Sequence, residues 1–72
     1  MLIGVPKEIK IHEYRVGLTP SSVREAIAHG HQVLVERDTG SGIGATDAAY
    51  ERAGASIAAS PEEVFAHADL IV

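Results

Sequence analysis

The residues best suited to chemistry lie in a charged segment between Pro6 and Pro20. This segment has about a dozen residues, whereas ~2–6 usually join a strand to a helix. Its ionisable residues are Lys7, Glu8, Lys10, His12, Glu13 and Arg15. Arginine can bind a carboxylate through two parallel hydrogen bonds, and a neighbouring glutamate can hold its orientation. The same composition also fits a solvated loop with internal ion pairs.

A second candidate is Gly40-Ser41-Gly42-Ile43-Gly44-Ala45, which matches the dinucleotide-binding pattern G-x-G-x-x-A. Glycines in that pattern let the backbone approach a pyrophosphate at a helix N-terminus. However, three residues separate the match from the preceding apolar run, and that run is the second of the sequence rather than the first. The stretch about 20 residues on, Ala58-Ala59-Ser60-Pro61, has no acid for a ribose. We therefore interpret the segment as a flexible surface turn without a cofactor.

The four histidines are scattered, and there is no cysteine, so no metal site is expected. His12 could act as an acid or base near neutral pH, but no partner for it is apparent. His29 and His31 have the i, i+2 spacing of a possible metal pair. Positions near a helix end, favourable to the helix dipole, are the simpler interpretation for them and for His67. No serine has a base at a motif spacing, so nucleophilic hydrolysis has no support.

The elements that must position these residues alternate along the chain. Short apolar runs predict strands over residues 2–5, 31–36, 55–58 and 68–72, buried on both faces of a parallel sheet. Helix-capping signals occur at Thr19, Thr46 and Ser60, the last with Pro61 and two glutamates behind it. Gly30 and Gly54 are expected to end the first two helices. The apolar helix residues predicted to pack inward are Val23, Ala26, Ile27, Ala49, Tyr50, Ala53, Val64 and Phe65.

This order predicts an α/β fold, a Rossmann-like parallel sheet with flanking helices and right-handed crossovers. The fourth apolar run reaches Val72 with no helix after it to cover the sheet. We therefore expect the first part of a larger domain, incomplete in this chain.

Composition limits the class of protein further. The chain has 72 residues, 46% of them hydrophobic, and a net charge of −4 with six basic residues. This balance argues against disorder, a nucleic-acid surface and an anionic membrane surface. No apolar run approaches the ~18 residues of a membrane span, and the N-terminus does not have the pattern of a signal peptide. A soluble, cytoplasmic protein is expected.

A family resemblance runs through the whole chain. It is carried by Gly4-Val5-Pro6-Lys7-Glu8-Ile9-Lys10, His12-Glu13-Tyr14-Arg15-Val16-Gly17-Leu18-Thr19-Pro20, Val33-Leu34-Val35-Glu36, Gly40-Ser41-Gly42-Ile43-Gly44, Asp47, Tyr50, Ala53-Gly54-Ala55 and Ala68-Asp69-Leu70-Ile71-Val72. These stretches resemble the N-terminus of the alanine dehydrogenase/nicotinamide nucleotide transhydrogenase family. Tyr14 and the Gly-Ile-Gly stretch are more similar to the alanine dehydrogenases. Ile11 departs from the pattern, since asparagine is frequent there.

The resemblance implies NAD-dependent, reversible oxidative deamination of L-alanine to pyruvate and ammonia, by a cytoplasmic homo-oligomer that is often a hexamer. It places residues 1–72 in the N-terminal part of the substrate domain, and NAD in a separate domain absent from this chain. The family's carboxylate-binding arginine maps onto Arg15, which is thus the expected substrate-binding residue. A second substrate-binding residue, a lysine, and the catalytic histidine and aspartate would lie beyond Val72. No catalytic, cofactor-binding or metal-binding residue is therefore expected here, and the chain alone should be inactive.

Two alternatives stay open at this point. One is the corresponding segment of a transhydrogenase α subunit, in which hydride passes between two nicotinamide nucleotides. The other is a standalone, non-enzymatic Rossmann-like binding module, which would have to cover both faces of its sheet, for example by oligomerising.

Overall fold

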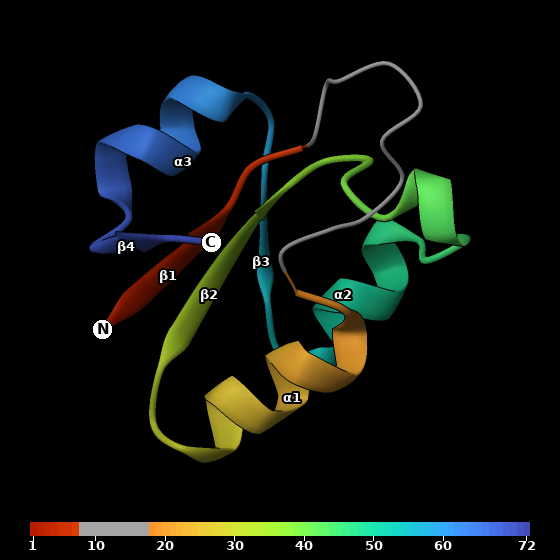
Figure 1. The fold of residues 1–72 in the computed structure, drawn as a ribbon, viewed down its shortest axis with the longest axis horizontal. Coiled ribbons are helices and arrows are strands. Elements are labelled where there is room, and N and C mark those ends of the chain that lie inside the picture. Colours follow the sequence, from red (N-terminus) through yellow and green to blue (C-terminus); the bar gives the residue numbers. More distant parts are fainter. Residues whose placement is uncertain (8–17) are drawn as a thin grey trace.

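The predicted strands assemble into one parallel sheet, in a computed structural model that describes residues 1–7 and 18–72 (Figure 1). The strands are β1 (Leu2–Val5), β2 (Gln32–Glu36), β3 (Ser56–Ala58) and β4 (Leu70–Ile71), in the order β3-β2-β1-β4. Helices α1 (Pro20–Ala28) and α2 (Asp47–Ala53) pack on one face, and α3 (Pro61–His67) packs on the other. A 3₁₀ turn, η1 (Ser41–Ile43), precedes α2. The predicted α/β architecture is confirmed.

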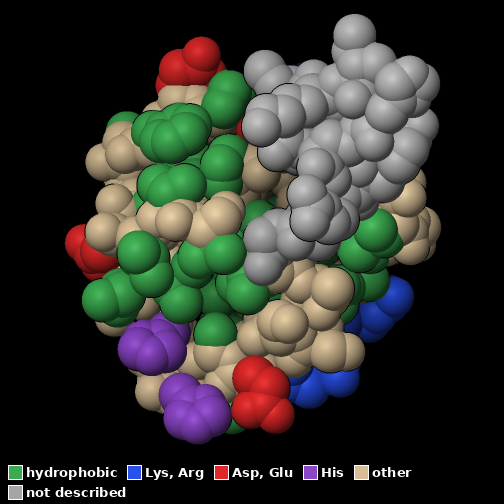
Figure 2. Space-filling model, viewed as in Figure 1, with side chains coloured by type: hydrophobic (Ala, Val, Ile, Leu, Met, Phe, Trp, Pro, Cys, Tyr) green, Lys and Arg blue, Asp and Glu red, His purple; other side chains and the backbone are tan. Residues whose placement is uncertain are grey.

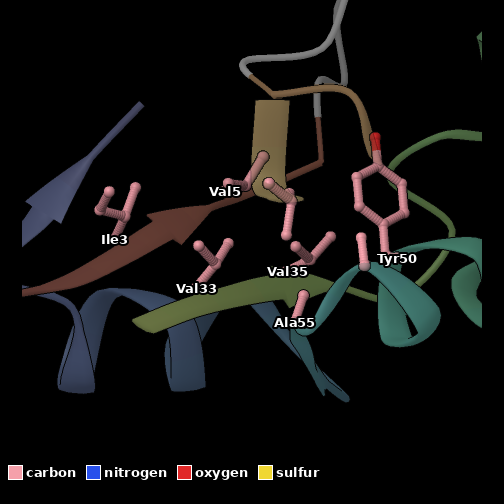
Figure 3. Packing of buried hydrophobic residues seen from close by; sticks show 8 residues of the cluster. Ile3, Val5, Val33, Val35, Tyr50 and Ala55 are labelled. Atoms are coloured by element: carbon pink, nitrogen blue, oxygen red, sulfur yellow. The ribbon is translucent and has the colours of Figure 1, made fainter. Parts of the chain in front are cut away.

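The main core lies between the sheet and the pair α1 and α2 (Figure 3). Because side chains alternate along a strand, the register Ile3↔Val33 and Val5↔Val35 places these four residues on one face of the sheet. The two helices and Ala55, which precedes β3, extend the same cluster, to which α1 and α2 contribute Val23, Tyr50 and Ala53. Full burial of one such Val or Ile side chain is worth about 1.5–3 kcal/mol. This cluster therefore fixes the sheet against the helices that flank it.

On the opposite face of the sheet the packed layer is thinner, because α3 lies close to β1 at Gly4. A β-carbon added at Gly4 would lie 2.6 Å from Ala68 Cβ and 2.7 Å from Val64 Cγ1. Val64 is fully buried, but Phe65 is 60% exposed, so the prediction of a core position for Phe65 is wrong. Adjacent helix residues point about 100° apart, and this seven-residue helix buries a single narrow side.

The predicted helix caps are present. Ser22, Ala49 and Glu63 donate their backbone N–H groups to Thr19, Thr46 and Ser60 respectively, at 3.3, 3.1 and 3.4 Å. Gly30 and Gly54, with φ of +87° and +112°, follow α1 and α2 as expected. Each helix therefore begins where the local sequence predicts, and α1 and α2 also end where it predicts.

The β4 edge differs from the expectation. A strand was expected over residues 68–72, but only Leu70 and Ile71 pair with β1, opposite Ile3 and Gly4. The side chains of Leu70, Ile71 and Val72 are 39–47% exposed rather than buried, because β4 is the edge strand of the described sheet. Figure 2 shows apolar side chains gathered over the region of α3 and β4. Within residues 1–7 and 18–72, no helix has the length and apolarity needed to cross a bilayer.

Candidate functional site

The candidate site lies at the carboxyl edge of the sheet, where β1 and β2 end side by side at Val5 and Val35. Parallel α/β sheets bind ligands outside the carboxyl ends of their strands. The segment predicted to bind substrate leaves this edge at Lys7 and returns to the described structure at Leu18. Arg15 and the neighbouring Glu8, Lys10, His12 and Glu13 lie outside the described residues. The assignment of Arg15 therefore stays a prediction.

The departing end of this segment is held by β2. The backbone N–H of Lys7 donates to Glu36 Oε1 at 2.8 Å, and Glu36 is the last residue of β2. A carboxylate acceptor makes this hydrogen bond stronger than one between neutral groups. Beside it, buried Thr39 donates a long 3.5 Å hydrogen bond from Oγ1 to the carbonyl of Val5. The chain thus leaves β1 with two polar contacts to the residues around the end of β2.

The returning end is held by α2. The hydroxyl of Tyr50 donates to the carbonyl of Leu18 at 2.8 Å, while the ring is fully buried beside Val35 (Figure 3). Burial, and to a smaller extent the charge of Asp47, raises the pKa of Tyr50 above its usual value of 10.0. The hydroxyl therefore stays protonated at neutral pH and remains a donor.

Sequence reasoning placed Tyr50 in the core and missed its hydrogen bond. The available signal was the residue type, since a buried tyrosine hydroxyl usually finds a partner whereas phenylalanine needs none. The partner itself, Leu18, is 32 positions away in the sequence, and helical periodicity gives no information about such a contact.

The Gly40–Ala45 segment is a turn whose first glycine is used for packing. A β-carbon at Gly40 would lie 2.6 Å from the Ala45 carbonyl oxygen and 2.9 Å from Tyr50 Cε2. At the start of α2, Thr46 accepts from the N–H of Ala49, and the carboxylate of Asp47 accepts from the N–H of Asp38 at 2.8 Å. A pyrophosphate there would meet the charge of Asp47. These residues do not fit a dinucleotide, and the structure supports the interpretation as a surface turn.

Two histidines occupy helix ends as predicted. His29 is the C-terminal cap residue of α1, with Nδ1 2.8 Å from the Glu25 carbonyl oxygen, and His67 lies in the last turn of α3. His31 Nδ1 is buried without a hydrogen-bond partner among the described residues. Within that same part of the chain, no three His, Asp or Glu residues gather to hold a metal ion. His12 lies outside it.

A hollow of about 550 Å³ opens at the amino edge of the sheet, away from the candidate site. Its lining includes residues that begin β1, β2 and β3, together with the end of α3: Leu2, Gln32, Ser56 and His67. This is the edge at which parallel sheets do not usually bind ligands. We therefore do not assign a site to it.

Comparisons with known proteins agree with the predicted resemblance. Residues 4–72 match the family model described as "Alanine dehydrogenase/PNT, N-terminal domain". The chain is 50% identical over 72 residues to alanine dehydrogenase of Halomonas elongata, covering 100% of this chain and 19% of that relative. It is 55% identical over 65 residues to alanine dehydrogenase of Bacillus subtilis, covering 90% of this chain and 17% of the relative. The chain thus spans about a fifth of the length of these curated relatives.

The fold is similar to that of solved structures, of which two are described here by name. One, an L-alanine dehydrogenase, superposes with a TM-score of 0.95 at 46% identity and covers 100% of this chain and 20% of that structure's chain. The other, a transhydrogenase from Sinorhizobium meliloti, gives 0.90 at 31% identity, covering 99% and 21%.

Proposed function

We propose, from the premise that this chain belongs to the alanine dehydrogenase/PNT family, that residues 1–72 form the N-terminal part of the substrate domain of an NAD-dependent alanine dehydrogenase. The reaction is reversible: L-alanine, NAD⁺ and water give pyruvate, ammonium, NADH and a proton. NAD would be bound by a domain outside this chain, since the described residues do not fit it. The observation that carries this proposal is the match to alanine dehydrogenases in both sequence and fold.

Within that reaction, Arg15 would bind the carboxylate of alanine or pyruvate. The planar guanidinium offers two parallel N–H donors that match the two carboxylate oxygens, which fixes the direction of the substrate as well as its charge. Such orientation can lower a reaction barrier by several kcal/mol when the geometry is tight. Lys7, after which this segment begins, follows β1 at the carboxyl edge of the sheet, and this placement supports the role.

The transhydrogenase alternative is disfavoured by the comparisons. The alanine dehydrogenase structure is more similar to this chain than the transhydrogenase structure, at 46% against 31% identity. The other alternative, a standalone module, would leave Leu70 and Ile71 as an exposed apolar edge strand, which favours uncontrolled strand pairing. The cytoplasmic location and the homo-oligomeric, often hexameric, state stay predictions.

The test is an assay of the complete protein with alternative substrates. We expect NADH absorbance to rise with L-alanine and NAD⁺, and to fall with pyruvate, ammonium and NADH. Two nicotinamide nucleotides without an amino acid should give no exchange. Hydride exchange between nucleotides, without turnover of alanine, would replace this proposal by the transhydrogenase function.

A further inference from the structure

We propose that residues 61–72, which contain α3 and β4, form a conformational strap that detaches from β1 and closes on it again while the main core stays folded. The strap lies away from α1 and α2, and its helix packs on the other face of the sheet (Figure 1). This device is independent of the proposed function, because it involves neither a substrate nor a cofactor.

The strap has a hydrophobic contact of its own, separate from the main core. The one buried residue of α3 is Val64, which is not a member of the cluster that joins the sheet to α1 and α2. In β4, Leu70 and Ile71 pair with β1, and their side chains are 47% and 39% exposed. Segments with few buried apolar contacts open at a lower free-energy cost than the rest of a domain. Opening of the strap therefore leaves the main cluster in place.

A close approach at Gly4 joins the strap to β1. The neighbours of Gly4 in β1 point into the main core, so this position faces α3. A β-carbon at Gly4 would lie 2.7 Å from Val64 Cγ1, 2.6 Å from Ala68 Cβ and 3.0 Å from Ile71 Cδ1. These atoms belong to α3, to its C-terminal cap and to β4. A methyl group at Gly4 would therefore press on every part of the strap rather than on the main core.

Asp69 holds the start of β4 to the start of β1. Its Oδ2 accepts the backbone N–H of Leu2 at 2.9 Å, and its own N–H donates to the carbonyl of Leu2 at 2.7 Å. Further along, the N–H of Val72 donates to the carbonyl of Gly4 at 3.0 Å. Asp69 and Val72 are exposed, so water can replace these hydrogen bonds when the strap opens. The Asp69 carboxylate therefore sets how often the strap opens.

The experiment measures hydrogen–deuterium exchange in the complete protein, resolved to single amides by mass spectrometry. The amides of Asp69 and Val72 report on the strap, and those of β2 on the main core. In the wild type, we expect both strap amides to exchange at least about 10-fold faster than the amides of β2. Asp69→Ala should lower the protection of both by about 10-fold and leave β2 within about two-fold. Asp69→Asn keeps an acceptor oxygen and should lie between the two.

Asp47→Ala is the matched control, since Asp47 Oδ1 accepts the N–H of Asp38 at 2.8 Å, away from the strap. It should leave the Val72 amide unchanged. Gly4→Ala should accelerate Val72 without accelerating β2, and the Asp69 variants keep the test decisive if Gly4→Ala does not fold. Equal acceleration of β2 and the strap would overturn the proposal, because the whole domain would then unfold together. Unchanged protection of Val72 in Asp69→Ala, different factors for Asp69 and Val72, or wild-type strap amides as protected as β2 would also overturn it.

Discussion

At each edge of the sheet, a side-chain carboxylate accepts a hydrogen bond from a backbone N–H group, but the two bonds hold different parts of the chain. At the amino edge, Asp69 accepts the N–H of Leu2 and joins β1 to the chain that enters β4. At the carboxyl edge, Glu36 accepts the N–H of Lys7 and holds the chain where it leaves β1. The amino edge has a hollow of about 550 Å³, and the carboxyl edge has hydrogen bonds to Lys7, where the chain leaves β1, and to Leu18. A hollow by itself therefore does not mark the site, since parallel α/β sheets usually bind ligands at the carboxyl ends of their strands.

The largest expected effect comes from the residue assigned to bind substrate. We predict that Arg15→Ala raises KM for pyruvate about 100-fold, because two charge-assisted hydrogen bonds to the carboxylate are lost. Arg15→Lys keeps the charge without the paired donors, so its KM should lie between those of the wild type and the alanine variant. KM for NADH serves as the internal control and should barely change. An unchanged KM for pyruvate in Arg15→Ala would remove this residue from the site.

A smaller effect, on stability, is expected at the turn beside the carboxyl edge. Gly40→Ala places a methyl group 2.6 Å from the Ala45 carbonyl oxygen, so the turn or the Tyr50 ring must shift. We predict a loss of about 1–3 kcal/mol in the free energy of unfolding, measured by urea denaturation of the complete protein. Gly42→Ala is the matched control, since Gly42 is exposed and its φ is not positive. Equal losses in both variants would contradict the packing role of Gly40.

Local signals predicted most of the fold, and contacts between distant residues account for what they missed. Thr19, Thr46 and Ser60 cap helices because a cap needs only the next three residues. The prediction of a core position for Phe65 was wrong because its burial depends on the orientation of α3 against the sheet. The spacing of residues within the helix does not specify that orientation.

For the candidate site too, the sequence predicted the local features but not the contacts between distant residues. The position of the charged segment after the first strand followed from the order of the elements. The bonds from Glu36 and Tyr50 to its ends join residues 29 and 32 positions apart, and no local pattern could indicate them. The assignment of Arg15 as the substrate-binding residue rests on the family resemblance.

The hydrogen bond between Tyr50 and Leu18 leads to a prediction of how the stability of the folded protein depends on pH. The pKa of Tyr50 is higher in the folded chain than in the unfolded one, so its contribution to stability is complete below pH 10 and is lost as the pH rises through the folded value. We predict that Tyr50→Phe lowers the free energy of unfolding by about 1 kcal/mol at neutral pH. The difference between wild type and variant should shrink above pH 10. Tyr14 and the lysines are common to both proteins and cancel in this difference, so a constant gap up to pH 11 would contradict the prediction.

The smallest expected effect tests the amino edge directly. Ser56→Ala and His67→Gln change two polar side chains that line its hollow, and neither side chain takes part in the hydrogen bonds of Lys7 to Glu36 and of Leu18 to Tyr50. We predict that KM for pyruvate and KM for NADH stay within about two-fold of the wild type, measured as in the Arg15 series, since surface substitutions away from a site change little. A ten-fold rise in either KM would place a substrate or cofactor at the amino edge. The site would then lie at the hollow of the amino edge and not at the carboxyl edge, where the chain leaves β1.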